Sequence, residues 1–493
     1  MFSPKRLFKQ TLGLLSLAGA LTLSRVNAYG QTQTEKPNFL FIFADDLTYE
    51  GIRSLGDLKI KTPNLDKLVK EGTTFTHTYN MGAWNGAVCM ASRAMINTGM
   101  YVWKTQDHMN EFRKNPQVKE SHPFWSEMMS NAGYETYFTG KWHVGVKPQQ
   151  IFDNVTDVRG GMPNQTKEGY NRPLSEDDKN WLPWDKTKNG FWKGGQHWTE
   201  KLGDTGVRYI EQASNKDKPF FMYLAFNAAH DPRQAPKEYV DMYPLKKIKT
   251  PKNFMADYPD FKTLFPKGNM RDERLAPFPR TEYSVKVNRQ EYYALITYMD
   301  EQIGRILDAL EKSGKADNTY IVFTADHGLS VGHHGLLGKQ NMYDHSIRVP
   351  FMVVGPNVPK NRKIKTPIYL QAVMPTALEV AGVQQPSYVD FKSVLPVIRG
   401  ERKSNLEAVY GGFMAQQRCV IQDNYKLILY PKSGVVKLFN MKKDANEMKN
   451  LAEKPEHKAR IKQMFEKLKD LQKENGDKLD LDQAYPALAS ANI

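Results

Sequence analysis

The sequence predicts an α/β protein with a mixed, mostly parallel sheet flanked by helices, followed by a small antiparallel sheet with one helix. Three observations predict this fold. Short apolar runs rich in β-branched and aromatic residues alternate with amphipathic helical patterns over the first 400 residues or so. Polar clusters follow directly after most of these runs. Beyond about Ser404, short strand-like runs follow one another at hairpin spacing.

Five apolar runs are expected to form strands of the main sheet: Asn38 to Phe43, Tyr134 to Thr139, Pro219 to Asn227, Tyr320 to Thr324 and Val349 to Gly355. After the first run, Thr62-Pro63 is a helix cap with proline at the first helical position, and Gly72 ends that helix. A long amphipathic helix is expected from about Gln290 to Lys312.

Polar residues terminate four of the five predicted strands. These clusters are Asp45-Asp46, Gly140-Lys141-Trp142-His143, Ala229-His230 and Asp326-His327. Ligands of open α/β sheets gather at the carboxyl ends of the strands. The four clusters are therefore expected to converge on one site.

The C-terminal part is expected to be a separate subdomain, 404–493, appended to a catalytic domain, 29–403. Its predicted strands are 408–412, 418–422, 425–430 and 436–439, and a charged helix spans about 455–475.

Within the larger domain, 153–198 is rich in Gly, Asn and Trp with weak periodicity, which predicts a long irregular segment over the active face. Its tryptophans, Trp181, Trp184, Trp192 and Trp198, could stack on sugar rings or pack in the core.

The N-terminus has the pattern of a signal peptide. Lys5, Arg6 and Lys9 precede an apolar run from Thr11 to Leu23, and Val26-Asn27-Ala28 is a small-residue ending. The run is too short to span a bilayer, so residues 1–28 are expected to be cleaved, with an uncleaved anchor as the alternative. No later stretch is apolar enough to cross a membrane, and the mature chain is expected in the periplasm or secreted, without stable membrane insertion.

Cysteine content and charge narrow the function classes. Only Cys89 and Cys419 are present, which excludes a disulfide framework. The formal net charge of +15 suits an acidic partner. No zinc-finger or helix-turn-helix pattern accompanies the dispersed Lys and Arg residues, so no nucleic-acid partner is expected and an anionic polysaccharide is favoured. A basic surface that serves solubility alone is the alternative.

Two motifs carry chemistry. The adjacent carboxylates Asp45-Asp46 repel each other unless a cation or hydrogen bonds compensate, so they indicate either metal ligation or a helix cap or turn. Asp326-His327-Gly328 at another strand end favours metal ligation by the carboxylates.

The second motif is Cys89-Met90-Ala91-Ser92-Arg93. If this segment is helical, Arg93 lies on the same face as the Cys89 thiol. This is either an activated thiolate or a buried cysteine beside an unrelated arginine.

Taken together, these pieces resemble the formylglycine-dependent sulfatases of the alkaline-phosphatase-like superfamily, over essentially the whole mature chain. The resemblance rests on Phe43-Ala44-Asp45-Asp46, Thr62-Pro63-Asn64-Leu65-Asp66, Cys89 to Arg93, Thr139-Gly140-Lys141-Trp142-His143, Ala228-Ala229-His230, Thr324-Ala325-Asp326-His327-Gly328 and Gly338-Lys339. Any one of these motifs could arise by chance, but their joint order is specific.

The resemblance implies that a maturation enzyme oxidises Cys89 to formylglycine. One hydroxyl of the hydrated aldehyde would attack sulfur and form a sulfo-enzyme, and the other would lose its proton to expel sulfate. It further implies that Ca²⁺ acts as a Lewis acid. Its ligands would be Asp45, Asp46, Asp326, His327 and an oxygen of the modified Cys89.

Roles for further residues follow from the same resemblance. Arg93 would orient the diol, and Lys141 and Lys339 would neutralise sulfate oxygens. His143 would assist proton removal from the diol, and His230 would protonate the leaving alcohol. His333, His334 and His345 match no family role and are expected to be loop residues or substrate contacts.

The chain departs from the common family pattern at two positions. Ala91 stands where the signature usually has Pro, which leaves open which maturation enzyme acts. His327 stands where Asn is common, so its imidazole could ligate the metal or contact sulfate.

The expected substrate is an O-sulfate ester on a sulfated polysaccharide or oligosaccharide. The alternatives are a phosphodiesterase or phosphonate hydrolase of the superfamily, a sulfatase for small aryl or choline esters, and a non-catalytic glycan-binding relative. The sequence specifies neither the sugar, the sulfate position, exo or endo action, nor the oligomeric state.

Overall fold

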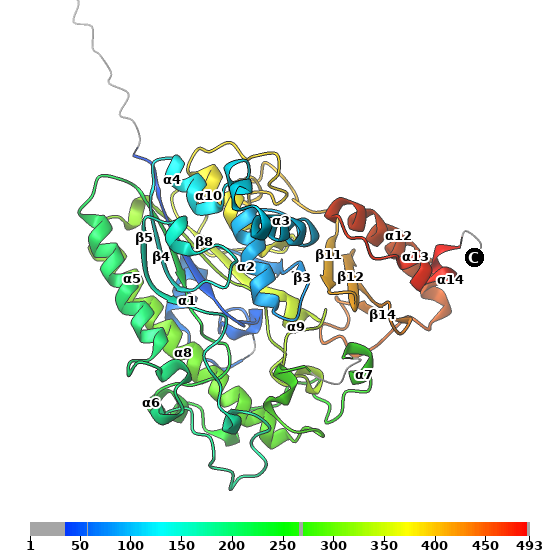
Figure 1. Cartoon of the computed structure of the whole chain (residues 1–493). Helices are drawn as coiled ribbons and strands as arrows, with labels where there is room; N and C mark the ends of the chain where they lie inside the picture. The colour runs from blue at the N-terminus through cyan, green and yellow to red at the C-terminus, as the bar shows by residue number, and fades with distance from the viewer. Residues whose placement is uncertain (1–34, 57, 266–269, 491–493) are drawn as a thin grey trace, which may run out of the picture. The chain divides into compact units, whose positions relative to one another are not determined.

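The computed structural model describes residues 35–56, 58–265 and 270–490 (Figure 1). The predicted signal peptide, 1–28, lies outside the described residues. The unit Lys36–Ile493 is compact and contains both sheets. Among the described residues, every helix is too short or too polar to cross a lipid bilayer.

A nine-stranded sheet forms the centre of this unit, in the order β10-β2-β8-β7-β1-β6-β4-β5, with β9 beside β2. The strands β7, β1, β6, β4 and β5 are mutually parallel, whereas β8 runs antiparallel to both β7 and β2. This confirms the mixed, mostly parallel sheet. The bounds are β1 Asn38–Ala44, β2 Thr73–Tyr79, β4 Glu135–Lys141, β5 Asn154–Arg159, β6 Phe220–Ala225, β7 Thr319–Ala325, β8 Arg348–Val354, β9 Arg362–Ile364 and β10 Ile368–Tyr369.

Apolar side chains cover both faces of the central strands. Every residue of β1 is buried, which is why its sequence is a continuous apolar run and not an alternating one. On one face, the Phe41 ring lies 5.4 Å from Trp125 and 4.8 Å from Tyr223, measured between ring centroids. Such aromatic packing makes the centre of the sheet a rigid support for the loops that follow its strands.

Helices pack as two groups. In the first group, α1 and α5 each pack against α8. In the second group, α2, α4 and α10 all contact one another. The longer helices are α1 Pro63–Glu71, α2 Val88–Thr98, α3 Val102–Lys114, α4 Trp125–Asn131, α5 Trp198–Ser214, α8 Glu282–Lys312 and α10 Val373–Val380. Short helices are α6 Lys237–Asp241, α7 Phe261–Leu264, α9 Asp344–Ile347, α11 Leu395–Arg399, α13 Leu481–Ala484 and α14 Pro486–Ala489.

The second sheet contains the predicted C-terminal hairpins and one strand from the N-terminal half. Its order is β14-β13-β12-β11-β3, and helix α12 (Lys458–Asn475) packs on it (Figure 1). The bounds are β3 Gly82–Ala83, β11 Val409–Phe413, β12 Gln417–Gln422, β13 Tyr425–Tyr430 and β14 Val435–Asn440. Because β3 pairs with β11, this sheet is joined to the segment that leads into α2. The domain boundary at residue 404 stays a prediction.

Two elements differ from the sequence-based expectation. The irregular segment 153–198 contains β5, an edge strand of half-buried residues, whose weak apolar pattern concealed it. Helix α8 begins at Glu282, earlier than expected, with the Thr281 side chain accepting a hydrogen bond from the Ser284 amide. Its first turns bury polar residues such as Asn288 and Arg289, so they lack the apolar periodicity of the remainder.

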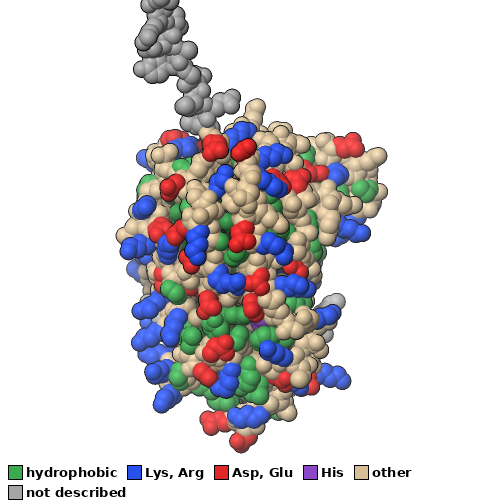
Figure 2. Space-filling model, turned by 90° about the vertical axis from the view of Figure 1, so that its left-hand side faces the viewer, with side chains coloured by type: hydrophobic (Ala, Val, Ile, Leu, Met, Phe, Trp, Pro, Cys, Tyr) green, Lys and Arg blue, Asp and Glu red, His purple; other side chains and the backbone are tan. Residues whose placement is uncertain are grey.

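Charged side chains of both signs lie on the face seen in Figure 2. Lys and Arg side chains gather along the lower left-hand edge of this face, and over the rest of it they are mixed with Asp and Glu side chains.

Gly140 permits the close pairing of β4 with β6. It follows a register shift between Thr139 and Gly140 in the pairing of β4 with β5, and it has a φ of +101°. A Cβ at this position would overlap the carbonyl oxygen of Ala225, so only glycine fits.

We expect Gly140→Ala to lower the free energy of unfolding by at least about 3 kcal/mol. Gly133→Ala is the matched control, because Gly133 has a φ of +92° but nothing within 4 Å of the added Cβ. It should cost only about 1–2 kcal/mol of backbone strain. Thermal unfolding of both variants measures the difference, and equal losses would show that the clash with Ala225 is unimportant.

Candidate active site

Four adjacent parallel strands deliver polar residues to one edge of the main sheet. In the order β7, β1, β6 and β4, their carboxyl ends lead to Asp326-His327, Asp45-Asp46, His230 and Lys141. All of these side chains are buried. The structure therefore brings together the four strand-end clusters that the sequence predicted to converge.

Three carboxylates lie at the centre of this cluster. Asp45 and Asp326 are fully buried, and Asp46 is 1% exposed. Burial raises the pKa of Asp45 well above its usual range, and repulsion from Asp326 adds to the shift, while Lys141 opposes it. Burial alone would also raise the pKa of Asp326, but His327, Arg93 and Lys141 hold it well below its usual range. The site thus concentrates negative charge that needs cationic partners.

Cys89 occupies the first turn of α2, beside these carboxylates. The helix begins at Val88, so the positive end of its dipole faces the sulfur. The His143 ring nitrogen Nδ1 lies 3.3 Å from the Cys89 Sγ. Burial alone would raise the pKa of the Cys89 thiol, but Lys141, His143 and His327 hold it well below its usual range. This position therefore favours a negatively charged or strongly polar group.

Arg93 follows one turn later on α2 and holds the carboxylates in place. Its Nε donates to Asp326 Oδ2 at 3.1 Å, and its Nη1 donates to the Lys141 carbonyl oxygen at 2.7 Å. The Lys141 ammonium group in turn donates to Asp45 Oδ2. Arg93 therefore links α2, β4 and β7 through buried charge-assisted hydrogen bonds.

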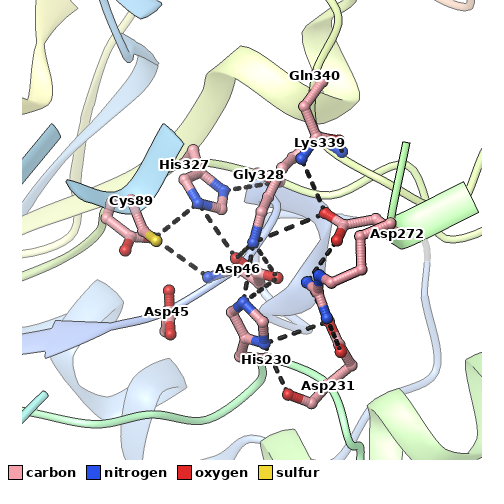
Figure 3. A network of polar contacts seen from close by, with 12 residues as sticks. Asp45, Asp46, Cys89, His230, Asp231, Asp272, His327, Gly328, Lys339 and Gln340 are labelled. Atoms are coloured by element: carbon pink, nitrogen blue, oxygen red, sulfur yellow. Dashed lines mark hydrogen bonds and ion pairs between the residues drawn. The ribbon is translucent and has the colours of Figure 1, made fainter. Parts of the chain in front are cut away.

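Lys339 and His230 meet on the other side of Asp46. The Lys339 ammonium group donates to both carboxylate oxygens of Asp46, at 2.8 and 2.9 Å, and lies 3.1 Å from His230 Nε2. Burial lowers the pKa of His230 well below its usual range despite Asp46, and Lys339 and Lys141 add to the effect. Because an ammonium group can only donate, His230 Nε2 accepts from Lys339 (Figure 3).

The donor set fits a divalent metal ion. One ligand atom each of Asp45, Cys89, Asp326 and His327 lies within 4.8 Å of the others. Within the described part of the chain, Asp45 Oδ1 is buried without a hydrogen-bond partner, and His327 Nε2 lies 3.1 Å from Asp46 Oδ1 and 3.5 Å from Asp326 Oδ1. Buried polar atoms without partners are costly, and hard oxygen donors from separate strands are typical of Ca²⁺ or Mg²⁺ sites.

Sequence reasoning missed a second layer of charged residues behind His230 and Lys339. The Asp231 carboxylate Oδ1 lies 3.2 Å from His230 Nδ1, and Arg271 donates to Asp231 Oδ2 at 2.5 Å. Arg271 also pairs with Asp272, whose Oδ2 accepts from Gln340 Nε2 at 3.0 Å (Figure 3). Asp231 could have been found because it follows His230 directly, but nothing in the local sequence marks Arg271 or Asp272.

The histidine cluster near Lys339 is buried. His334 Nδ1 lies 3.2 Å from His345 Nε2, and His333 lies 2.8 Å from the Asn253 side-chain oxygen through its own Nδ1. These contacts favour a structural role for all three histidines over contact with the substrate.

For Trp181 and Trp192, packing in the core is favoured over stacking on a sugar. They are 5% and 6% exposed and so offer little surface to a sugar ring.

Comparisons with known proteins agree with this geometry. Residues 37–383 match the family model described as Sulfatase, and residues 332–474 match the model described as N-sulphoglucosamine sulphohydrolase, C-terminal.

Relatives and solved structures match over most of the chain. A sulfatase of Formosa agariphila is 28% identical, covering 87% of this chain and 86% of its own. An N-acetylglucosamine-6-O-sulfatase of Bacteroides thetaiotaomicron is 26% identical, covering 94% and 91%. The solved phosphonate monoester hydrolase of Silicibacter pomeroyi shares the fold, with a TM-score of 0.71, 21% identity and coverage of 90% and 96%.

Proposed function

This chain belongs to the sulfatase family and is a sulfuric ester hydrolase, and we propose that it removes O-sulfate groups from a sulfated polysaccharide or oligosaccharide. In this proposal the protein is exported to the periplasm or beyond. A formylglycine formed at Cys89 by a maturation enzyme is the nucleophile, and Ca²⁺ is the metal ion.

One observation carries the proposal: Cys89 lies at the helix terminus where buried carboxylates and cations converge. Its sulfur marks the position of the reacting oxygen in the modified residue. Asp45, Asp326 and His327 border this position within 4.8 Å, as a metal-activated nucleophile requires. The N-acetylglucosamine-6-O-sulfatase that resembles the chain over 94% of its length supports a sugar substrate.

Asp45, Asp46, Asp326 and His327, with the modified residue 89, would hold the metal ion. When bound, Ca²⁺ supplies Lewis-acid polarisation and reduces repulsion between the nucleophile and an anionic ester. The buried Asp45 Oδ1, which has no hydrogen-bond partner among the described residues, and the approach of His327 Nε2 to Asp46 and Asp326 support these ligands.

Lys141 and Lys339 would neutralise the sulfate oxygens. Both ammonium groups are buried and are already held by carboxylates, Lys141 by Asp45 and Lys339 by Asp46. Such preorganised charges need little rearrangement when negative charge develops on the substrate. Arg93 would orient the nucleophile, because it is anchored to Asp326 and to the Lys141 backbone.

Two histidines would move the protons. His143 Nδ1 lies 3.3 Å from the Cys89 sulfur and would take a proton from a hydroxyl group at that position. His230 would protonate the leaving alcohol. Asp231 presents its carbonyl oxygen at 2.7 Å and its carboxylate at 3.2 Å to His230 Nδ1, which stabilises a protonated imidazole. An anionic substrate offsets the charge of Lys339 and so raises the pKa of His230 on binding.

Activity measurements on matched esters test the substrate class. The mature protein should hydrolyse sulfated oligosaccharides faster than aryl sulfate, choline sulfate, phosphate diesters or phosphonate monoesters, with the released sulfate, or the released alcohol for the phosphorus esters, measured in each case. Cys89→Ala should lower the rate at least about a thousandfold, because the nucleophile is removed. Turnover of aryl or choline esters without any sulfated saccharide would contradict the glycan substrate, and preferred phosphonate turnover would identify the alternative activity.

Mass spectrometry tests the nucleophile separately. The peptide containing Cys89, from protein made in its native host or with a maturation enzyme, should be about 18 Da lighter than the cysteine form. Cys419 is the internal control and should keep its mass, because the residues after it, Val420 to Asp423, lack the Ala-Ser-Arg that follows Cys89-Met90. An unmodified Cys89, under conditions where a control peptide is converted, would count against formylglycine.

Calcium should stabilise chelator-treated protein. At a hundredfold excess over Kd we expect the unfolding temperature to rise by roughly 3–5 °C, because Ca²⁺ binds only the folded site. Asp326→Asn should abolish the rise. Asp390→Asn, which removes a surface partner of Lys104, should retain it. A rise of the same size in Asp326→Asn would place the calcium elsewhere.

A further inference from the structure

One pocket of the protein is lined by residues that the proposed mechanism does not use. It has a volume of about 540 Å³ and is lined by Lys167, Tyr170, Asn171, Arg274 and Phe278, among others. Two segments form it, one around the short helix η4 (Lys167–Gly169) and one around η8 (Asp272–Leu275).

The pocket walls are held firmly. The Asn171 amide donates to the Arg274 carbonyl oxygen at 2.6 Å, which joins the two segments directly. Arg172 forms a buried bidentate pair with Glu291 of α8. Glu273 accepts from the Gly338 amide at 2.8 Å and from Arg280 at 2.8 Å. These buried contacts make the pocket a preformed cavity.

Arg271 connects this pocket to the reaction site. It hydrogen-bonds to Tyr170 in the pocket wall and to Asp231, which contacts His230. The next residue, Asp272, lies 3.9 Å from the Lys339 ammonium group. The pocket wall is therefore linked through Arg271 and Asp231 to His230, which would protonate the leaving alcohol, and the remainder of a saccharide substrate would extend towards it.

The chemistry of the pocket suits an anion. Lys167 and Arg274 are exposed, and neither forms an ion pair with any residue that the structure describes. The Glu273 carboxylate is neutralised by Arg280, so it does not offset them. Arg274 lies 5.3 Å from the Tyr170 ring centroid, which aligns its guanidinium along the wall. Phe278 is 38% exposed and adds apolar surface of the kind that packs on a sugar ring.

We propose that this pocket binds an acidic sugar unit, bearing a carboxylate or a sulfate, next to the unit whose sulfate is removed. Lys167 and Arg274 contact its anionic group, and Phe278 packs on its ring. The inference rests on the proposed function and adds a preference for substrates with an acidic neighbouring unit.

Matched disaccharide sulfates test this subsite. One has a uronate as the second sugar, one has the carboxyl-reduced form of that sugar, and one has a sulfated neutral sugar. In the double variant Lys167→Gln/Arg274→Gln, kcat/KM on the acidic substrates should fall at least about tenfold, because charge-assisted hydrogen bonds are lost. On the carboxyl-reduced substrate it should change less than about twofold.

Arg460→Gln is the matched control, because Arg460 also lies over a tyrosine, Tyr425, at 4.0 Å but on α12. It should leave all three rates unchanged. A loss in the double variant that is equal on acidic and neutral substrates, or no loss on any, would overturn the subsite. A loss on only one of the acidic substrates supports it and identifies carboxylate or sulfate as the ligand.

Calorimetry separates failure of the subsite from failure of the proposed function. If the wild-type protein cleaves no sulfated saccharide, its binding of a hexauronate and of the carboxyl-reduced hexamer is measured. Binding of the hexauronate alone, weakened at least about tenfold in the double variant, supports the pocket even though the proposed function fails. No binding, or equal binding by both proteins, overturns the pocket as well.

Discussion

Neutralisation of three buried carboxylates is the constraint on which the arrangement of the sheet edge depends. Asp45, Asp46 and Asp326 are removed from water, and each contacts a cation that comes from another part of the chain. Lys141 arrives from β4, Arg93 from α2 and Lys339 from the loop beyond β7. Burying charges without such partners costs several kcal/mol per ion. The strands and α2 must therefore be packed together before the three carboxylates can be buried without that loss of stability.

The second sheet contributes to this constraint from outside the main sheet. Strand β3 pairs with β11 and leads into α2, which carries Cys89. From β12, the Gln417 side chain donates to the Gln340 carbonyl oxygen at 3.0 Å, next to Lys339. Two segments that bear reacting groups are thus supported by the C-terminal hairpins. Substitutions that destabilise the second sheet would therefore displace Cys89 or Lys339, although none of the side chains of that sheet has a proposed chemical role.

Much of the fold and of the candidate site could be predicted from the sequence because strong signals are local. A continuous apolar run such as Asn38–Ala44 indicates a buried strand, and a polar residue at its end indicates the functional edge. Edge strand β5 was missed because half-buried residues give little periodicity. Arg271 was missed for a different reason: its partners Asp231 and Tyr170 are distant in sequence, and an isolated arginine in a loop carries no pattern. Long-range ion pairs are set by tertiary packing, which no window of sequence contains.

The burial of Cys89 constrains when its proposed modification can occur relative to folding. Its side chain is 4% exposed within a helix whose following residues are almost all buried, so the folded chain offers no extended peptide around it. A maturation enzyme that oxidises Cys89, as proposed, would need access to this buried side chain. In that proposal, modification precedes the packing of α2 onto the sheet. A chain that folds first would be trapped as a stable, inactive protein, and the rate of folding relative to the rate of maturation would set the active fraction.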